Sequence, residues 1–86
     1  MKKITMFTME SCPYCKSARK WMNEVIKSDA KYGEIPLTII DEIKEPVLAA
    51  KFDYYYVPTY YIGDEKVHEG VASFEIVKRV FDGALD

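Results

Sequence analysis

Cys12 and Cys15 are separated by two residues and are the only cysteines in this 86-residue chain. Such a Cys-x-x-Cys pair supplies either two thiols close enough to join or half of a four-ligand zinc site. An alternating apolar and polar run, Ile4–Thr8, precedes the pair, and residues 16–27 follow with helical spacing of apolar side chains. A pair of cysteines at a strand-to-helix turn is typical of a dithiol redox site.

The position of the pair predicts different roles for the two sulfurs. Cys12 precedes the predicted helix, where the helix dipole and unpaired N–H groups favour a thiolate and lower its pKa from about 8.5. We expect Cys12 to be the more exposed sulfur and to attack a substrate disulfide. Cys15 is expected to face the core and to displace the product, which leaves a Cys12–Cys15 disulfide for another thiol to reduce.

Three other uses of the pair are chemically conceivable. A zinc site needs two more ligands, and the only histidine, His68, lies on a different predicted strand. A purely structural disulfide is disfavoured, because closing so small a loop removes little chain entropy. An iron–sulfur cluster held by Cys12 of two chains, or another metal-binding module on the same cysteine, stays open as an alternative of a different class. We expect no metal site and no bound cofactor.

The elements that position the pair follow from local patterns. Residues 3–8 alternate as a half-buried strand does, and Pro13 suits the first position of a helix that ends near Ser28 and Asp29. Residues 37–40 form a second strand, parallel to the first and closed by Asp41.

The second half of the chain is predicted to contain a helix, a hairpin and a last helix. A short helix is expected over residues 46–52, and residues 54–58 are extended because they lead into a proline. The strand over residues 59–62 turns back through Gly63 and Asp64 into an antiparallel partner over residues 66–69. Ser73 is the expected N-cap of the last helix. The fold class is therefore α/β, with the order β-α-β-α-β-β-α and a four-stranded mixed sheet covered by three helices.

Length and composition restrict the class of protein. Residues 1–86 make one domain, and a net charge of −2 gives no basic face for nucleic acid. No segment reaches the roughly 18 apolar residues of a membrane helix. The apolar run behind Lys2 and Lys3 is short, which favours a mature start over a signal peptide. Two close cysteines in such a chain indicate a thiol pair cycling in a reducing compartment, so we expect a cytoplasmic monomer.

The tetrapeptide Cys12-Pro13-Tyr14-Cys15 resembles the active site of dithiol glutaredoxins, a branch of the thioredoxin-like fold. Val57-Pro58 before a strand is similar to that family's Val-Pro element, and Gly70 matches the second glycine of its Gly-Gly element. The resemblance covers nearly the whole chain. Thioredoxins proper carry an extra strand and helix before the motif, whereas only eleven residues precede Cys12 here, so the length also favours the glutaredoxin branch.

The resemblance implies a substrate site around the cysteines. It implies a cis Val57-Pro58 bond facing Cys12, which frees the N–H and C=O of Val57 to pair with an extended substrate. It implies disulfide-containing protein substrates and glutathione mixed disulfides, with glutathione as reductant; a thioredoxin-reductase-like flavoprotein is the alternative electron source. The substrate-binding candidates are Pro13, Tyr14, Tyr56, Val57, Pro58, and Ala72 and Ser73 through backbone and hydroxyl contacts.

Several positions depart from the family pattern. Met9 stands where glutaredoxins have a lysine or arginine for the glycyl carboxylate of glutathione, and Tyr56 replaces a threonine before the Val-Pro element. Glu69 replaces the first glycine. Residues 71–73, Val-Ala-Ser, lack the carboxylate that receives the glutathione ammonium, a hydrogen bond of about 1.5–3 kcal/mol. The residues thus predict dithiol chemistry more strongly than they predict glutathione as the partner.

Other polar and aromatic side chains are interpreted as structural. Lys16, Arg19 and Lys20 read as a solvated helix face, although Lys16 could add positive potential near Cys12. The tyrosines of residues 54–61 read as strand and core material, with Tyr56 also a candidate wall of a substrate groove. Asp41 is expected to cap the end of its strand, with proton transfer to the inner cysteine as an alternative.

Overall fold

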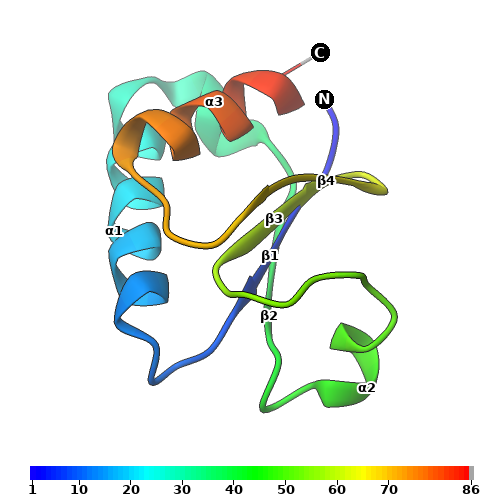
Figure 1. Cartoon of the computed structure of the whole chain (residues 1–86). Helices are drawn as coiled ribbons and strands as arrows, with labels where there is room; N and C mark the ends of the chain where they lie inside the picture. Colours follow the sequence, from blue (N-terminus) through cyan, green and yellow to red (C-terminus); the bar gives the residue numbers. More distant parts are fainter. Residues whose placement is uncertain (86) are drawn as a thin grey trace.

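A computed structural model describes residues 1–85 (Figure 1). The elements follow the predicted order, with one 3₁₀ helix added between α1 and β2, and they are β1 (Ile4–Thr8), α1 (Pro13–Ser28), η1 (Ala30–Glu34), β2 (Leu37–Asp41), α2 (Pro46–Ala49), β3 (Thr59–Ile62), β4 (Glu65–Glu69) and α3 (Phe74–Ala84). Within the described range, no helix is both long and apolar enough to cross a membrane.

The four strands form one mixed sheet in the order β2-β1-β3-β4. β1 is parallel to β2, with Ile4 opposite Leu37, and antiparallel to β3, with Met6 opposite Tyr60. β3 and β4 form the antiparallel hairpin through a turn in which Gly63 has a φ of 59°. The predicted fold class is confirmed in its strand count, its mixed pairing and its three α-helices.

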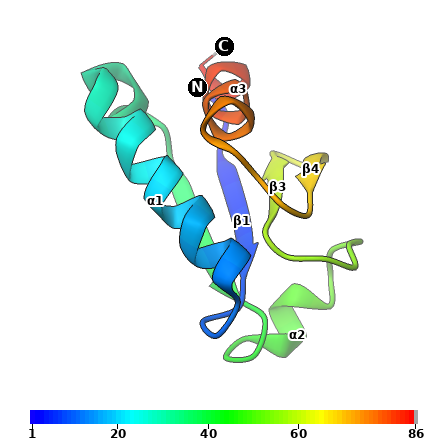
Figure 2. The ribbon, with the colours of Figure 1, turned by 60° about the vertical axis from the view of Figure 1, so that its left-hand side comes forward.

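The sheet separates two hydrophobic clusters. The larger cluster lies between the sheet and helices α1 and α3, and the smaller cluster lies on the opposite face with α2. Figure 2 shows α1 and α2 on the two sides of β1. β1 lies between the two clusters, and all five of its residues are buried. The prediction of a half-buried first strand was therefore wrong, because the period-2 alternation of residues 4–8 reflects two different buried faces rather than one buried and one wet face.

The smaller cluster is mainly aromatic. The ring of Phe7 lies 4.7 Å from the rings of both Phe52 and Tyr54, and Tyr61 meets Phe7 edge-on at 5.8 Å. α2 ends at Ala49, three residues before the predicted end at Phe52. The helix stops early because Phe52 leaves the helical path and turns its ring into this cluster, a tertiary contact that local helix propensity does not contain.

The start of α3 is fixed by its predicted cap. Ser73 has an extended backbone, and its hydroxyl oxygen accepts a hydrogen bond of 3.2 Å from the N–H of Ile76. The side chains of Val77, Val80 and Phe81 then pack into the larger cluster. A hydroxyl acceptor at this position pairs one of the N–H groups that the first turn of a helix leaves free.

We expect Ser73→Ala to lower the free energy of unfolding by about 1 kcal/mol, the usual cost of removing an N-cap acceptor. Urea unfolding followed by far-ultraviolet circular dichroism measures the change. Ser17→Ala, on the exposed face of α1, is the matched control and should change stability by less than about 0.5 kcal/mol. Equal effects of the two substitutions would contradict a capping role for Ser73.

Candidate active site

The two cysteines lie at the start of α1, just after the loop that connects it to β1. Cys12 is the N-cap of α1, its carbonyl accepts the N–H of Lys16 at 3.1 Å, and Pro13 occupies the first helical position as predicted. Both cysteines are free thiols. Cys12 keeps 8% of its surface exposed, whereas Cys15 keeps none. Cys12 is therefore the more exposed sulfur, as predicted, although it is less open than expected.

The pKa of Cys12 is lowered from its ordinary value. Partial burial raises the pKa, but this is outweighed by hydrogen bonds from the backbone and thiol of Cys15, by the N–H of Tyr14 and by the charge of Arg19. These N–H groups belong to the first turn of α1, which is the predicted source of thiolate stabilisation. Cys12 is therefore the sulfur that ionises first.

The pKa of Cys15 moves the other way. Burial raises it, hydrogen bonds from the Thr8 hydroxyl and the Met9 backbone lower it, and the hydrogen bond and charge of Cys12 raise it again. The hydroxyl oxygen of Thr8 also accepts a hydrogen bond of 2.9 Å from the guanidinium of Arg19. Thr8 therefore bonds Arg19 directly and also influences the pKa of the buried Cys15.

The loop of residues 53–58 contains the Val57-Pro58 bond, which is cis as the resemblance implied. Pro58 is fully buried and Val57 is half-buried. In the part of the chain that the structure describes, neither the N–H nor the C=O of Val57 takes part in a hydrogen bond. Both groups are therefore free for the predicted pairing with an extended substrate.

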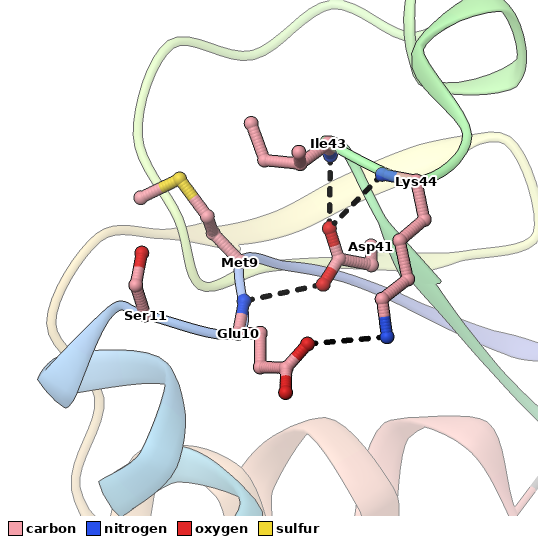
Figure 3. A pocket seen from close by; sticks show the side chains of 6 residues that line it. All are labelled: Met9, Glu10, Ser11, Asp41, Ile43 and Lys44. Atoms are coloured by element: carbon pink, nitrogen blue, oxygen red, sulfur yellow. Dashed lines mark hydrogen bonds and ion pairs between the residues drawn. The ribbon is translucent and has the colours of Figure 1, made fainter.

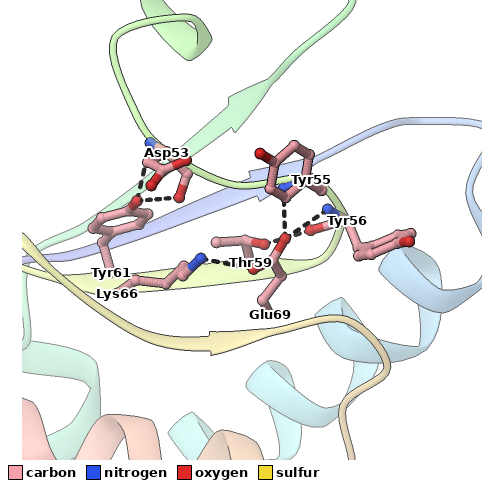
Figure 4. A network of polar contacts seen from close by, with 7 residues as sticks. All are labelled: Asp53, Tyr55, Tyr56, Thr59, Tyr61, Lys66 and Glu69. Atoms are coloured by element: carbon pink, nitrogen blue, oxygen red, sulfur yellow. Dashed lines mark hydrogen bonds and ion pairs between the residues drawn. The ribbon is translucent and has the colours of Figure 1, made fainter.

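Glu69, at the end of β4, holds this loop in place (Figure 4). Its carboxylate accepts the N–H groups of Tyr55 and Tyr56 at 2.5 and 2.9 Å and pairs with Lys66 at 2.7 Å. The Lys66 contact first, and then the two N–H groups, lower the pKa of Glu69 to about 2. Because the pKa is depressed, the contact stabilises the loop above the ordinary pKa of a glutamate and is lost only as the pH falls towards 2.

A second carboxylate, Asp41, holds the loop that leads into Cys12 (Figure 3). One oxygen accepts the N–H groups of Ile43 and Lys44 at 2.9 and 3.3 Å, and the other accepts the N–H of Glu10 at 3.2 Å. The ammonium of Lys44 meets the Glu10 carboxylate at 3.1 Å. The strand-capping interpretation of Asp41 is supported, and both of its oxygens are engaged with the backbone rather than with Cys15.

An open pocket of about 370 Å³ lies beside this loop, and its lining residues are Met9, Glu10, Ser11, Asp41, Ile43 and Lys44. It adjoins the approach to Cys12 but contains no cation free of a carboxylate, because Lys44 is paired with Glu10. The position that binds the glycyl carboxylate in glutaredoxins, Met9, is thus not replaced by another free positive charge in this pocket.

The other predicted substrate residues differ in their accessibility to a partner. Tyr14 and Tyr56 are 56% and 70% exposed, so both rings are available to a partner. Ala72 packs against the larger cluster, and the hydroxyl of Ser73 is used as the cap of α3. The Nε2–H of His68 donates to the carbonyl oxygens of Gly70 and Val71, at 3.2 and 2.9 Å. Among residues 1–85, no three metal-ligating side chains converge on one point.

Sequence reasoning missed the polar support of the two cysteines. Arg19 was read as part of a solvated face, whereas it reaches Thr8 and acts on Cys12. Lys16, which was expected to supply positive potential, is not among the groups that set the pKa of Cys12. The spacing of Cys15 and Arg19 could have indicated the role of Arg19, because residues four apart lie on the same face of a helix.

Comparison with known proteins agrees with this geometry. A family model described as a thioredoxin domain matches residues 2–82, and the chain belongs to that family. A structure described as a malarial protein shares the fold, with a TM-score of 0.72, 22% identity and 96% of each chain covered. The solution structure of an uncharacterized thioredoxin-like protein from Clostridium perfringens gives a TM-score of 0.70 and 26% identity, covering 98% of this chain and 71% of the other. No curated protein matches the sequence significantly.

The family and the adjacent cysteines together indicate a thiol redox role. The resemblance noted in the sequence is thereby supported at the level of the thioredoxin-like fold.

We expect the pH midpoint for alkylation of Cys12 by iodoacetamide to lie below that of free cysteine, because its pKa is lowered. Arg19→Gln should move this midpoint upward, since it removes a charge that favours the thiolate. Lys16→Gln, the same loss of charge on the same helix, is the matched control and should leave the midpoint in place. Equal midpoints for wild type and Arg19→Gln would show that Arg19 does not act on Cys12.

Proposed function

We propose that the protein is a thiol–disulfide oxidoreductase that reduces disulfides in extended protein segments. The observation that carries the proposal is the placement of two free thiols at the start of one helix, with Cys12 at its cap and partly exposed and Cys15 fully buried. The pKa of Cys12 is lowered and that of Cys15 is raised, in agreement with this placement. An attacking thiol must be ionised before it meets the substrate, whereas a resolving thiol must stay protonated until the mixed disulfide has formed.

In the first step, the Cys12 thiolate attacks one sulfur of the substrate disulfide. A bond forms between Cys12 and that sulfur, the substrate S–S bond breaks, and the second substrate sulfur leaves with the electron pair and takes up a proton. In the second step, Cys15 gives up its proton and attacks Cys12, which releases the first substrate sulfur as a thiol. The substrate gains two electrons, and the protein is left with a Cys12–Cys15 disulfide.

The loop of residues 53–58 supports a protein substrate. The free N–H and C=O of Val57 can add an extended peptide as a strand, and the exposed ring of Tyr56 lies one residue away. Pairing of this kind reads backbone rather than side chains, so it suits substrates of varied sequence. Glu69 restrains the same loop through Tyr55 and Tyr56, which lowers the entropy that ordering it on binding would cost.

We expect Cys12→Ser to abolish reduction of insulin disulfides, because the remaining thiol, Cys15, is buried and has a raised pKa. Cys15→Ser should instead arrest the reaction at a mixed disulfide through Cys12, which mass spectrometry of the non-reduced protein detects. Turnover of Cys15→Ser at the wild-type rate would contradict the resolving role. A Cys12→Ser variant that remains active would contradict the proposed function.

For the electron source, we propose a thioredoxin-reductase-like flavoprotein in a reducing compartment such as the cytoplasm. The supporting observation is that no free positive charge stands where glutaredoxins bind the glycyl carboxylate of glutathione: Met9 occupies that position, and the nearby Lys44 is paired with Glu10. Glutathione, acting as in glutaredoxins, is the second candidate. The Cys12-Pro13-Tyr14-Cys15 tetrapeptide favours it, and no resident cofactor is proposed in either case.

Insulin reduction followed by NADPH consumption separates the two electron sources. We expect turnover with thioredoxin reductase to exceed turnover with glutathione and glutathione reductase. One missing charge-assisted hydrogen bond should lower the glutathione-dependent rate by roughly tenfold. Met9→Lys should raise the glutathione-dependent rate by a similar factor, whereas the uncharged control Met9→Gln should not. Faster turnover with glutathione in the wild type would instead establish the glutaredoxin-type reaction.

A further inference from the structure

The two reaction steps proposed above do not involve the hydroxyl of Tyr60. Tyr60 is fully buried in the larger cluster, and its hydroxyl is the one buried side-chain polar atom of residues 1–85 that lacks a hydrogen-bond partner. A buried hydroxyl without a partner is destabilising, and phenylalanine would fill the same space without that cost. A polar group kept in an apolar core at such a cost suggests a use in another state of the protein.

The position of Tyr60 relates it to the resolving cysteine. It lies in β3 opposite Met6 of β1, on the face of the sheet that α1 covers. Thr8 lies two residues along β1 from Met6 and therefore on the same face. The hydroxyl of Thr8 lowers the pKa of Cys15 and accepts the hydrogen bond from Arg19.

The electrostatics of the site agree with this placement. Burial raises the pKa of Tyr60, the charge of Cys15 raises it further, and the charge of Arg19 lowers it. Within the described residues, Cys15 and Arg19 are the two groups whose charge shifts the pKa of Tyr60. Cys12 is the group whose charge shifts the pKa of Cys15. A raised pKa keeps the phenol protonated, so near neutral pH it can donate a hydrogen bond but cannot serve as a base.

We propose that the Tyr60 hydroxyl donates a hydrogen bond to the Cys15 sulfur as it becomes a thiolate during resolution, with Thr8 and Arg19 as positioning residues. The proposal rests on the dithiol function proposed above and assigns it a further residue. Before substrate binds, the Cys15 thiol favours the Cys12 thiolate, and burial together with the hydrogen bond and charge of Cys12 keeps the pKa of Cys15 raised. Once Cys12 is joined to substrate, that contact ends and the negative charge moves to Cys15. The unpaired Tyr60 hydroxyl then forms its strongest hydrogen bond, because the acceptor is charged and buried.

Atoms and electrons balance without a further reagent. The Cys15 thiol loses its proton, and its sulfur forms a bond to Cys12 while the bond between Cys12 and the substrate sulfur breaks. The departing substrate thiolate carries the electron pair and ends with the proton that Cys15 lost. Tyr60 keeps its own proton throughout and supplies only a dipole. Its contribution is therefore confined to the second step of the reaction.

The reaction of reduced protein with excess 5,5′-dithiobis(2-nitrobenzoate) separates the two steps. Attack by Cys12 releases one coloured thiolate at a rate proportional to reagent concentration, and resolution by Cys15 releases a second at a rate independent of it. Cys15→Ser should show the first release alone and so assigns the phases. Tyr60→Phe should leave the first phase unchanged, slow the second by about five- to tenfold, and move its pH midpoint upward.

Tyr32→Phe is the matched control, because it removes another buried phenol, one that donates to Asp82 far from the cysteines along the chain. It should leave both phases unchanged. Urea unfolding of Tyr60→Phe should give a stability equal to or above wild type, which excludes misfolding as the cause of a slow second phase. A normal second phase in Tyr60→Phe, with two phases in wild type, overturns this proposal and leaves the dithiol function standing. A wild-type protein that releases only one thiolate overturns both.

Discussion

The contact between the Cys15 thiol and the Cys12 sulfur is the interaction on which the rest of the site depends. Burial raises the pKa of Cys15, and the backbone N–H of Cys15 lowers the pKa of Cys12; the contact between the two sulfurs adds to both shifts, so two identical side chains acquire different chemistry. The contact requires both sulfurs at the first turn of α1, where N–H groups have no helical partners. Pro13 fixes that turn, since it fits the first helical position without loss of a hydrogen bond. Burial of β1 beneath α1 then sets the depth at which Cys15 lies.

Two carboxylates organise the loops on either side of the cysteines, and they do so in the same way. Asp41 gathers three backbone N–H groups at the end of β2, and Glu69 gathers two at the end of β4. Each turns an irregular segment into a fixed one by supplying an acceptor that the backbone lacks. Glu69 also shows that a residue that departs from a family motif can have a structural role of its own. Where glutaredoxins have glycine, this chain has an acceptor that ties the Val57 loop to the sheet.

Local sequence signals were sufficient for most of the fold. The start of α1 at Pro13, the turn at Gly63 and the cap at Ser73 each depend on residues within one turn of the feature, and each was predicted correctly. The end of α2 and the burial of β1 were not, because both depend on packing against distant elements. The supporting roles of Arg19 and Glu69 were missed for the same reason. Arg19 bonds a residue eleven positions away, and Glu69 bonds one fourteen positions away, so no short pattern contains either contact.

The alternation of side chains along β3 has a consequence for the evolution of the chain. Tyr60 and Tyr61 are neighbours on opposite faces, one beneath α1 and the other bonded to Asp53 beside α2, and the pairing with β4 changes register between them. Insertion or deletion of one residue ahead of them would exchange the two phenols between the faces. Length variation among homologues should therefore be rare between Pro58 and Tyr61 and more frequent in the exposed turn at residues 63–64.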